Sequence, residues 1–221
     1  KVAYLTEGNE LIRFENNLKS KMNVNYALAS NSGTAALHLI YKSIGLSKGD
    51  KILTSPITFI ATANAAKMCG AKVLFSDVDK STGLMTAENI EKSILHYKGN
   101  IKVITVVHLG GRLCNMKAIS KVAKKYNCIL VEDACHAIGA IYNSENTKSY
   151  VGSCKYSLAS SFSFHAIKNI TCSEGGCITT NNKEIYEKIK LLRSHNLQKD
   201  ISKITKIPEK NALWYYEAKD I

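Results

Sequence analysis

The chain has 221 residues, of which 45% are hydrophobic and 22% are charged, as in an ordinary globular protein. This length suffices for one sizeable hydrophobic core, or for a large domain with a short appendage. No apolar run approaches the roughly 20 residues of a membrane-spanning helix, and the N-terminus lacks the basic and apolar segments of a secretory signal. The composition therefore predicts a soluble, cytoplasmic protein without a membrane partner.

The chain is basic, because 30 lysine and arginine residues against 18 acidic ones give a formal net charge of +12. Such an excess can attract nucleic acid or an anionic metabolite. However, the lysines are scattered along the whole chain, and arginine occurs only at positions 13, 112 and 193. Since the sequence has no basic stripe with interleaved aromatic residues, we expect no nucleic-acid partner.

Seven cysteines are present, and no two of them have C-x-x-C spacing. An odd number without the spacing of metal ligands favours free thiols in a reducing compartment over a disulfide framework or a zinc site. We therefore expect no metal ion in this protein.

Helical and strand patterns alternate over the first 140 residues. Apolar residues at helical spacing from Leu11 to Met22 predict an N-terminal helix. Continuous apolar strands that alternate with helices are typical of a mainly parallel sheet covered by helices. After residue 140 the order changes, and no pattern assigns an element after Lys199. The predicted helices are 35–44, 58–68, 86–95, 115–126 and 183–194, and the predicted strands are 51–55, 72–76, 101–107, 128–131, 157–163 and 176–180.

Two common nucleotide-binding signatures, G-x-G-x-x-G and G-x-x-x-x-G-K-[ST], are absent. Three other segments carry residues suited to a ligand site. The first is Asn31-Ser-Gly-Thr-Ala-Ala36, in which a glycine at a helix start lets backbone N–H groups approach a phosphate. Taken alone, this segment is better explained as an ordinary capped helix.

The second segment is the acidic pair Glu132-Asp133, which directly follows a buried strand. It places a carboxylate at the carboxyl edge of the sheet, where ligands of such folds collect, although such a pair can also cap a helix. The third runs from Ser163 to Lys168 and continues to Glu174-Gly-Gly, which suits a lysine presented to a cleft. Since the chain has 27 lysines, the alternative for any one of them is a solvated side chain.

The order of these segments resembles that in the DegT/DnrJ/EryC1/StrS family of sugar aminotransferases, which use pyridoxal 5'-phosphate (PLP). The resemblance runs from about Leu5 to Tyr216. It implies a three-layer α/β fold, the large domain of PLP-dependent transferase fold type I, with a mainly parallel mixed sheet. The segments that carry it are Asn31-Ser-Gly-Thr-Ala-Ala36, Pro56-Ile-Thr-Phe59, Val106-Val-His-Leu-Gly110, Glu132-Asp-Ala-Cys-His-Ala137 and Ser163-Phe-His-Ala-Ile-Lys168.

The resemblance also implies a domain division and the roles of two central residues. Residues 1–199 would form the PLP-binding large domain, and 200–221 would begin the connection to a missing C-terminal small domain. Lys168 would hold the cofactor through its side-chain nitrogen and, once released, carry a proton between substrate and cofactor. Asp133 would lie beneath the pyridine nitrogen and keep it protonated. In some relatives a histidine replaces this lysine and the enzyme is a dehydratase, so Lys168 implies transamination.

Five further residues would position the cofactor by the same resemblance. Phe59 would stack on the ring, and His136 would lie near the phenolic oxygen. The phosphate would be bound by Gly33, Thr34 and Ser163. The alternatives are a core position for Phe59 and, for Ser163, a hydroxyl satisfied within its own strand.

Finer features resemble the branch of the family that makes UDP-4-amino-4,6-dideoxy-N-acetyl-β-L-altrosamine for pseudaminic acid; among them are Leu5-Thr-Glu-Gly8 and Trp214-Tyr-Tyr-Glu217. This implies transfer of an amino group from an amino acid, with glutamate as the expected donor, to C4 of a UDP-linked 4-keto-6-deoxy-N-acetyl hexose. The alternatives are another nucleotide-linked keto sugar, or a truncated paralogue that binds PLP without turnover. Relatives continue into a Gly-x-Asn-x-Arg stretch that reaches the partner subunit's cofactor, so we expect this chain to be a fragment of a homodimeric enzyme.

Overall fold

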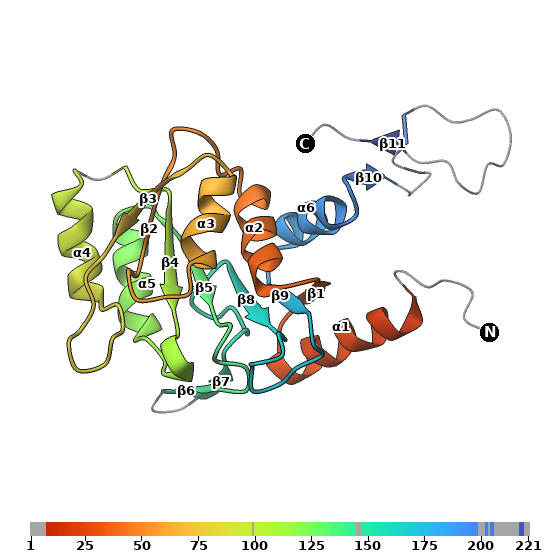
Figure 1. Ribbon diagram of the computed structural model, residues 1–221, viewed down its shortest axis with the longest axis horizontal. Helices are drawn as coiled ribbons and strands as arrows, with labels where there is room; N and C mark the ends of the chain where they lie inside the picture. Colours follow the sequence, from red (N-terminus) through yellow and green to blue (C-terminus); the bar gives the residue numbers. More distant parts are fainter. Residues whose placement is uncertain are drawn as a thin grey trace, which may run out of the picture.

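The computed structural model describes residues 8–98, 100–144, 147–198, 202, 204–205 and 217–218. Within this part of the chain, seven strands form one sheet in the order β1-β9-β8-β5-β4-β2-β3 (Figure 1). Neighbouring strands are parallel except at β9, which is antiparallel to both β1 and β8. The expected mainly parallel mixed sheet is therefore present. Its strands are β1 (Tyr26–Ser30), β2 (Lys51–Thr54), β3 (Lys72–Phe75), β4 (Val103–Val107), β5 (Ile129–Asp133), β8 (Ala159–Ser163) and β9 (Gly176–Thr180).

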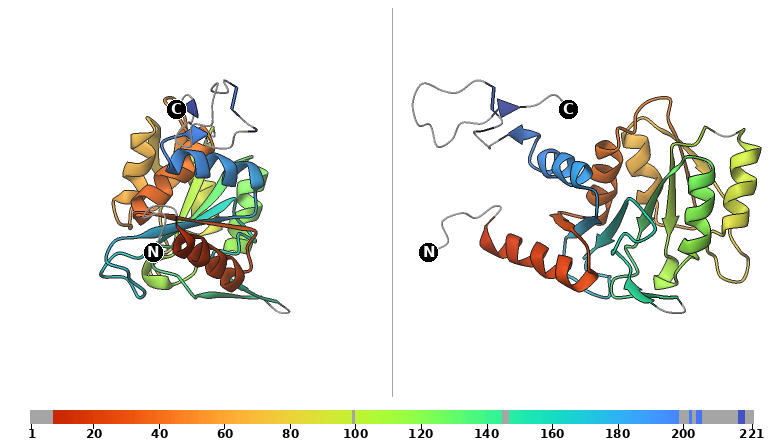
Figure 2. Two further views of the ribbon diagram at one scale, coloured as in Figure 1. Left: turned by 90° about the vertical axis from the view of Figure 1, so that its right-hand side faces the viewer. Right: turned by 180° about the vertical axis from the view of Figure 1, so that it is seen from behind.

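Helices cover both faces of this sheet and give the expected three layers (Figure 2). Helices α2, α3 and α6 pack on one face, and α1, α4 and α5 pack on the other. Four of these helices begin at a Ser, Thr or Asn whose side chain accepts a hydrogen bond from a backbone N–H three residues later, as helix N-caps commonly do. The helices are α1 (Asn9–Met22), α2 (Gly33–Ser43), α3 (Ala61–Met68), α4 (Ala87–His96), α5 (Met116–Lys125) and α6 (Lys183–Arg193).

Successive residues of each central strand belong to different layers, because side chains alternate between the two faces of a sheet. In β5, Val131 packs with α2 and α3, whereas Leu130 packs with α4 and α5. Asp133 lies two residues after Val131 and therefore faces the α2 and α3 layer at the carboxyl end of β5. The alternation thus fixes which of the two adjacent acidic residues can reach a site on that face.

Several boundaries differ from the predicted ones: β5 ends at Asp133 rather than at residue 131, so Glu132 and Asp133 are its last two residues. Helix α3 begins at Ala61 rather than at residue 58, since residues 55–60 form a loop in which Ile57 N donates to Ser55 Oγ (3.0 Å). Strand β1 was not predicted, because its short and alanine-rich sequence carries little strand propensity. Its position is set instead by pairing along its whole length with β9. The hairpin of β6 (Ile141–Ser144) and β7 (Thr147–Tyr150) was also not predicted.

The predicted connection at 200–221 falls almost entirely outside the described residues. The described part of this connection includes β11 (Glu217–Ala218), which pairs with β10 (Leu197–Gln198) just before residue 200. None of the helices among the described residues has the length and apolar content that a membrane crossing requires.

We expect Ile40→Ala in α2 to lower the free energy of unfolding by about 2–5 kcal/mol, because this fully buried side chain would leave a cavity. Leu95→Ala on α4 is the control, since that side chain is 61% exposed, and we expect a change of less than about 1 kcal/mol. Urea denaturation followed by circular dichroism measures both. Equal losses in the two variants would contradict the placement of Ile40 in the core.

Candidate active site

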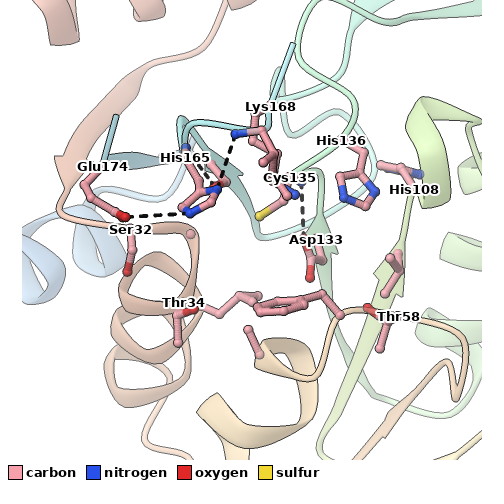
Figure 3. Close-up of a pocket in the computed structure, with 17 residues that line it drawn as sticks. Ser32, Thr34, Thr58, His108, Asp133, Cys135, His136, His165, Lys168 and Glu174 are labelled. Carbon is pink, nitrogen blue, oxygen red and sulfur yellow. Dashed lines mark hydrogen bonds and ion pairs between the residues drawn. The ribbon is translucent and has the colours of Figure 1, made fainter. Parts of the chain in front are cut away.

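A cavity of about 280 Å³ lies at the carboxyl ends of β4, β5 and β8, beside the first turn of α2 (Figure 3). It is only a little smaller than typical small-molecule sites, which span about 300–1,000 Å³. The fold brings together here all seven side chains or backbone positions that the sequence indicated as a ligand site. They are Gly33, Thr34, Phe59, Asp133, His136, Ser163 and Lys168.

The first turn of α2 packs directly on the sheet, which brings its backbone N–H groups to the cavity. A Cβ atom on Gly33 would lie 2.8 Å from Cys135 Sγ and 2.9 Å from Ser163 Cβ, so only glycine fits without displacement. A Cβ on Gly176 in β9 would lie 2.4 Å from the carbonyl carbon of Ser32. Ser32 caps the helix by accepting from Ala35 N (3.1 Å). The helix N-terminus, with Thr34 beside it, is therefore fixed where an anionic group can be bound.

Asp133 is the buried acidic group of the cavity, which the exposed Glu174 also lines, and the carboxylate of Asp133 is held on both oxygens. Its Oδ1 accepts from the backbone N–H of Cys135 (3.2 Å), and its Oδ2 accepts from the hydroxyl of Thr62 (2.6 Å). Only 6% of the residue is exposed. A buried carboxylate held by two donors is a rigid acceptor that still has lone pairs for a ligand N–H group.

Glu132 points to the opposite face and does not line the cavity. Its carboxylate accepts hydrogen bonds from His108 Nε2 (2.9 Å) and Ser160 Oγ (3.2 Å), and from the hydroxyls of Tyr142 and Ser157. Burial raises the pKa of Glu132, but these donors, His108 first, outweigh it and leave the pKa below its ordinary value. This network ties the ends of β4, β5, β6 and β8 together beneath the cavity, which is a structural task.

His136 is presented to the cavity as a neutral hydrogen-bond donor. The backbone N–H of Gly110 donates to its Nδ1 (3.2 Å), so the ring proton of the neutral form lies on Nε2. Burial lowers the pKa of His136, and the positive charge of Lys168 lowers it further. Gly110 and Gly111 both have positive φ, and a Cβ on Gly111 would lie 2.9 Å from the carbonyl oxygen of His136. Gly111 is thus needed for this close approach, whereas Gly110 serves the left-handed backbone conformation.

Lys168 lies in the segment between β8 and β9, in a turn that is closed by a hydrogen bond from its backbone N–H to the carbonyl of His165 (2.9 Å). The side chain is half-buried and lines the cavity together with Asp133. The ring of His165 lies 3.7 Å from a carboxylate oxygen of Glu174, which joins the two ends of the segment (Figure 3). Ser163 Oγ accepts from His165 N (3.3 Å), so the hydroxyl proton of Ser163 is free for a further acceptor.

Phe59 lies in the loop between β2 and α3, and its side chain is 68% exposed although it lines the cavity. An aromatic ring that borders a cavity without being packed in the core is suited to stack on a flat ligand. The core alternative for Phe59 is therefore wrong.

Several lining residues were not singled out as site residues from the sequence: Thr58, His108, Cys135, His165 and Glu174. The Cys135 thiol is half-buried, and burial together with the charge of Asp133 raises its pKa, so it is a poor nucleophile.

Thr58 and the buried Thr62 are four residues apart in the 58–68 segment, where a sequence pattern shows only a small-residue helix. The contact of Thr62 with Asp133 could be found only from the tertiary structure.

These residues fit PLP by their chemistry. A lysine, an acidic acceptor, a neutral ring donor and an aromatic face surround one cavity, and the Gly33 backbone at a helix N-terminus leaves room for a phosphate.

We expect His136 to titrate below its ordinary pKa of about 6.5, because the folded environment disfavours the charged ring. Lys168→Ala removes a nearby positive charge and should therefore raise the pKa of His136 toward that value, while burial keeps it below. Proton NMR of the histidine ring against pH measures both. A pKa of His136 that does not move in Lys168→Ala, while His38 also stays constant as a control, would contradict the proximity of the two side chains.

Comparison with known proteins agrees with this geometry. A sequence profile of the DegT/DnrJ/EryC1/StrS aminotransferase family matches residues 1–209. The chain is 45% identical over 195 residues to the UDP-4-amino-4,6-dideoxy-N-acetyl-beta-L-altrosamine transaminase of Campylobacter jejuni, an alignment that covers 88% of this chain and 50% of that protein.

Two solved structures show the same fold. Helicobacter pylori PseC, an aminotransferase involved in the biosynthesis of pseudoaminic acid, aligns with a TM-score of 0.84 and 34% identity over 99% of this chain and 54% of its own. NtdA from Bacillus subtilis with bound cofactor PMP aligns with a TM-score of 0.80 and 28% identity over 92% of this chain and 44% of its own. The chain thus spans about half the length of the curated relatives it matches. These similarities confirm the PLP-dependent aminotransferase fold, and the chain belongs to the DegT/DnrJ/EryC1/StrS aminotransferase family.

Proposed function

We propose that this chain carries the cofactor half of a PLP-dependent aminotransferase that acts on a nucleotide-linked keto sugar. The observation that supports this most directly is that Lys168 and Asp133, which come from segments 35 residues apart, line one cavity at the carboxyl ends of the parallel strands. A nucleophilic amine and an acidic acceptor that line the same cavity supply the groups that the two ends of a pyridoxal ring require. NtdA, with its bound PMP, is a relative of the same fold that holds the amine form of this cofactor.

When bound, PLP would supply an aldehyde that takes up an amine and a ring that accepts electrons. Lys168 Nζ would bind that aldehyde and, after the amino donor has displaced it, would move a proton to and from the substrate carbon. Asp133 would accept the hydrogen bond of the ring nitrogen and keep the nitrogen protonated. His136 would donate its Nε2–H to the phenolic oxygen.

The remaining residues would orient the cofactor. Phe59 would cover one ring face, while the first-turn amides of Gly33 and Thr34 and the hydroxyl of Ser163 would hold the phosphate. Residues 1–199 would act as the PLP-binding large domain, and the complete enzyme would be a cytoplasmic homodimer in which a partner subunit completes the site.

The substrate we propose is a UDP-linked 4-keto-6-deoxy-N-acetyl hexose, aminated at C4 with L-glutamate as donor for a pseudaminic acid-type sugar. The support is the 45% identity to the Campylobacter jejuni protein, which is named as a transaminase of a UDP-linked 4-amino sugar, and the similarity to PseC, which is named as an aminotransferase involved in the biosynthesis of pseudoaminic acid.

We expect the purified chain to gain a visible absorbance band with added PLP, and borohydride to fix the cofactor on Lys168. Lys168→Ala should lose both signals, because its side chain has no amine. Lys92→Ala on α4 is the control, since that side chain is 70% exposed and paired with Glu88. Mass spectrometry of peptides locates the reduced adduct. An equal yield of adduct on other lysines in Lys168→Ala would overturn the role of Lys168.

We expect L-glutamate to bleach the visible band of the PLP-loaded protein, and the 4-keto UDP-sugar to restore it with release of an amino sugar. Asp133→Asn should slow the glutamate step on the order of 100-fold, as loss of a preorganised electrostatic contact does. Stopped-flow absorbance and mass spectrometry of the sugar measure both steps. Restoration by a GDP- or dTDP-linked keto sugar instead would identify a different substrate, whereas a band unchanged by any amino acid would indicate a PLP-binding paralogue without turnover.

A further inference from the structure

Thr62 is a buried hydroxyl group in contact with Asp133, and none of the roles proposed above uses it. The residue is 0% exposed, and it lies in the first turn of α3. Its Oγ1 is 2.6 Å from Asp133 Oδ2, 2.8 Å from Thr58 Oγ1 and 3.2 Å from the carbonyl oxygen of Phe59. One hydroxyl therefore touches both the acidic group of the cavity and the loop that carries the aromatic ring.

The chemistry of these groups fixes the direction of the hydrogen bonds. A carboxylate and a carbonyl accept only, and a hydroxyl has one proton to donate. The proton of Thr62 goes to Asp133, because that contact is the shortest and the acceptor is charged. Thr62 Oγ1 then accepts from Thr58, whose hydroxyl is the remaining donor. The result is a directional chain from the Thr58 hydroxyl through Thr62 to Asp133.

The backbone of Thr62 is held as firmly as its side chain. The buried hydroxyl of Tyr41 donates to the Thr62 carbonyl (3.3 Å) and pairs with Thr105 Oγ1 (2.9 Å) on β4. Thr62 N donates in turn to the Phe59 carbonyl (3.2 Å). Thr62, the middle residue of the hydrogen-bond chain, is thus attached through its backbone to the buried Tyr41 and Thr105 pair of α2 and β4 and to the Phe59 loop.

We infer that Thr62 is a positioning residue, which aims the Asp133 carboxylate at the ring nitrogen and couples its position to the Phe59 loop through Thr58. The inference rests on the proposed PLP site. A carboxylate with one unheld oxygen can rotate about its Cβ–Cγ bond, whereas donors on both oxygens fix its plane. Without the Thr62 hydroxyl, Cys135 N would be the remaining donor to Asp133 among those described. The position of Asp133 at the ring nitrogen would then no longer be coupled to the position of Phe59 on the ring face.

Three variants separate the hydroxyl from the shape of the side chain. Thr62→Val removes the hydroxyl at nearly constant volume, Thr62→Ser keeps it, and Thr58→Val removes only the upstream donor. Thr180→Val is the matched control, because Thr180 is also buried and its hydroxyl donates to a carbonyl, that of Leu158 (2.7 Å), at the far end of β9. The melting temperature of each variant without cofactor shows any general loss of stability.

The measurements are the PLP dissociation constant by equilibrium dialysis and the pH midpoint of the visible band of the bound cofactor. We expect Thr62→Val to raise the dissociation constant about tenfold, the effect of one hydrogen bond to a charged group, and to shift the pH midpoint. Thr62→Ser should stay within about twofold of wild type, and Thr58→Val should weaken binding less than Thr62→Val. Wild-type binding and an unshifted midpoint in Thr62→Val, or equal weakening in Thr62→Ser, would overturn the inference.

A readout without cofactor separates this inference from the proposed function. In the cofactor-free protein, the Thr62 hydroxyl proton should exchange slowly enough for proton NMR, and its resonance should move in Thr58→Val. A rapidly exchanging hydroxyl would refute the chain even if PLP binds to wild type. Absence of PLP binding in wild type would instead refute the proposed site, and the positioning role would fall with it, whatever the NMR result.

Discussion

The site depends on the parallel alignment of β4, β5 and β8, which brings their carboxyl ends side by side under the first turn of α2. Parallel strands end at one edge of a sheet, so the last residues of strands distant in sequence meet there. The start of α2 packs closely on the sheet, because a Cβ atom on Gly33 would meet the side chains of Cys135 and Ser163, and one on Gly176 in β9 would meet the backbone of Ser32. A cavity lined by N–H groups of a helix start results from that close packing.

The two acidic neighbours at the end of β5 illustrate how one strand serves two purposes. Asp133 faces the cavity, while Glu132 points away from it and accepts hydrogen bonds from His108, Tyr142 and two serines. A fully buried charge is costly unless hydrogen bonds satisfy it, and Glu132 accepts four. The network thus stabilises the backbone at the end of β5, which carries Asp133. Because this backbone is fixed, a single hydroxyl such as that of Thr62 can control the direction of the Asp133 carboxylate.

The sequence resemblance to the family is concentrated in the residues that form the cavity. The segments that carry the resemblance to sugar aminotransferases supply residues that line the cavity, and they include Gly33, which packs against Cys135 and Ser163, and Gly110, whose N–H donates to His136. The chain spans about half the length of its curated relatives, and this half holds the seven-stranded sheet. It also holds the cavity and its lining residues Lys168, Asp133 and Phe59.

The sequence by itself predicted the alternation of strands and helices and the parallel character of the sheet, because periodicity is a local property of the chain, and the resemblance of its ordered motifs to sugar aminotransferases pointed to the seven candidate residues. It did not indicate β1, whose alanine-rich segment becomes a strand only by pairing with β9. Only the family resemblance separated the roles of Glu132 and Asp133, since the environments of adjacent residues differ only once the strand has two covered faces. The contact of Thr62 with Asp133 joins residues 71 positions apart. Such a contact depends on how α3 packs over β5, and that is decided by tertiary packing alone.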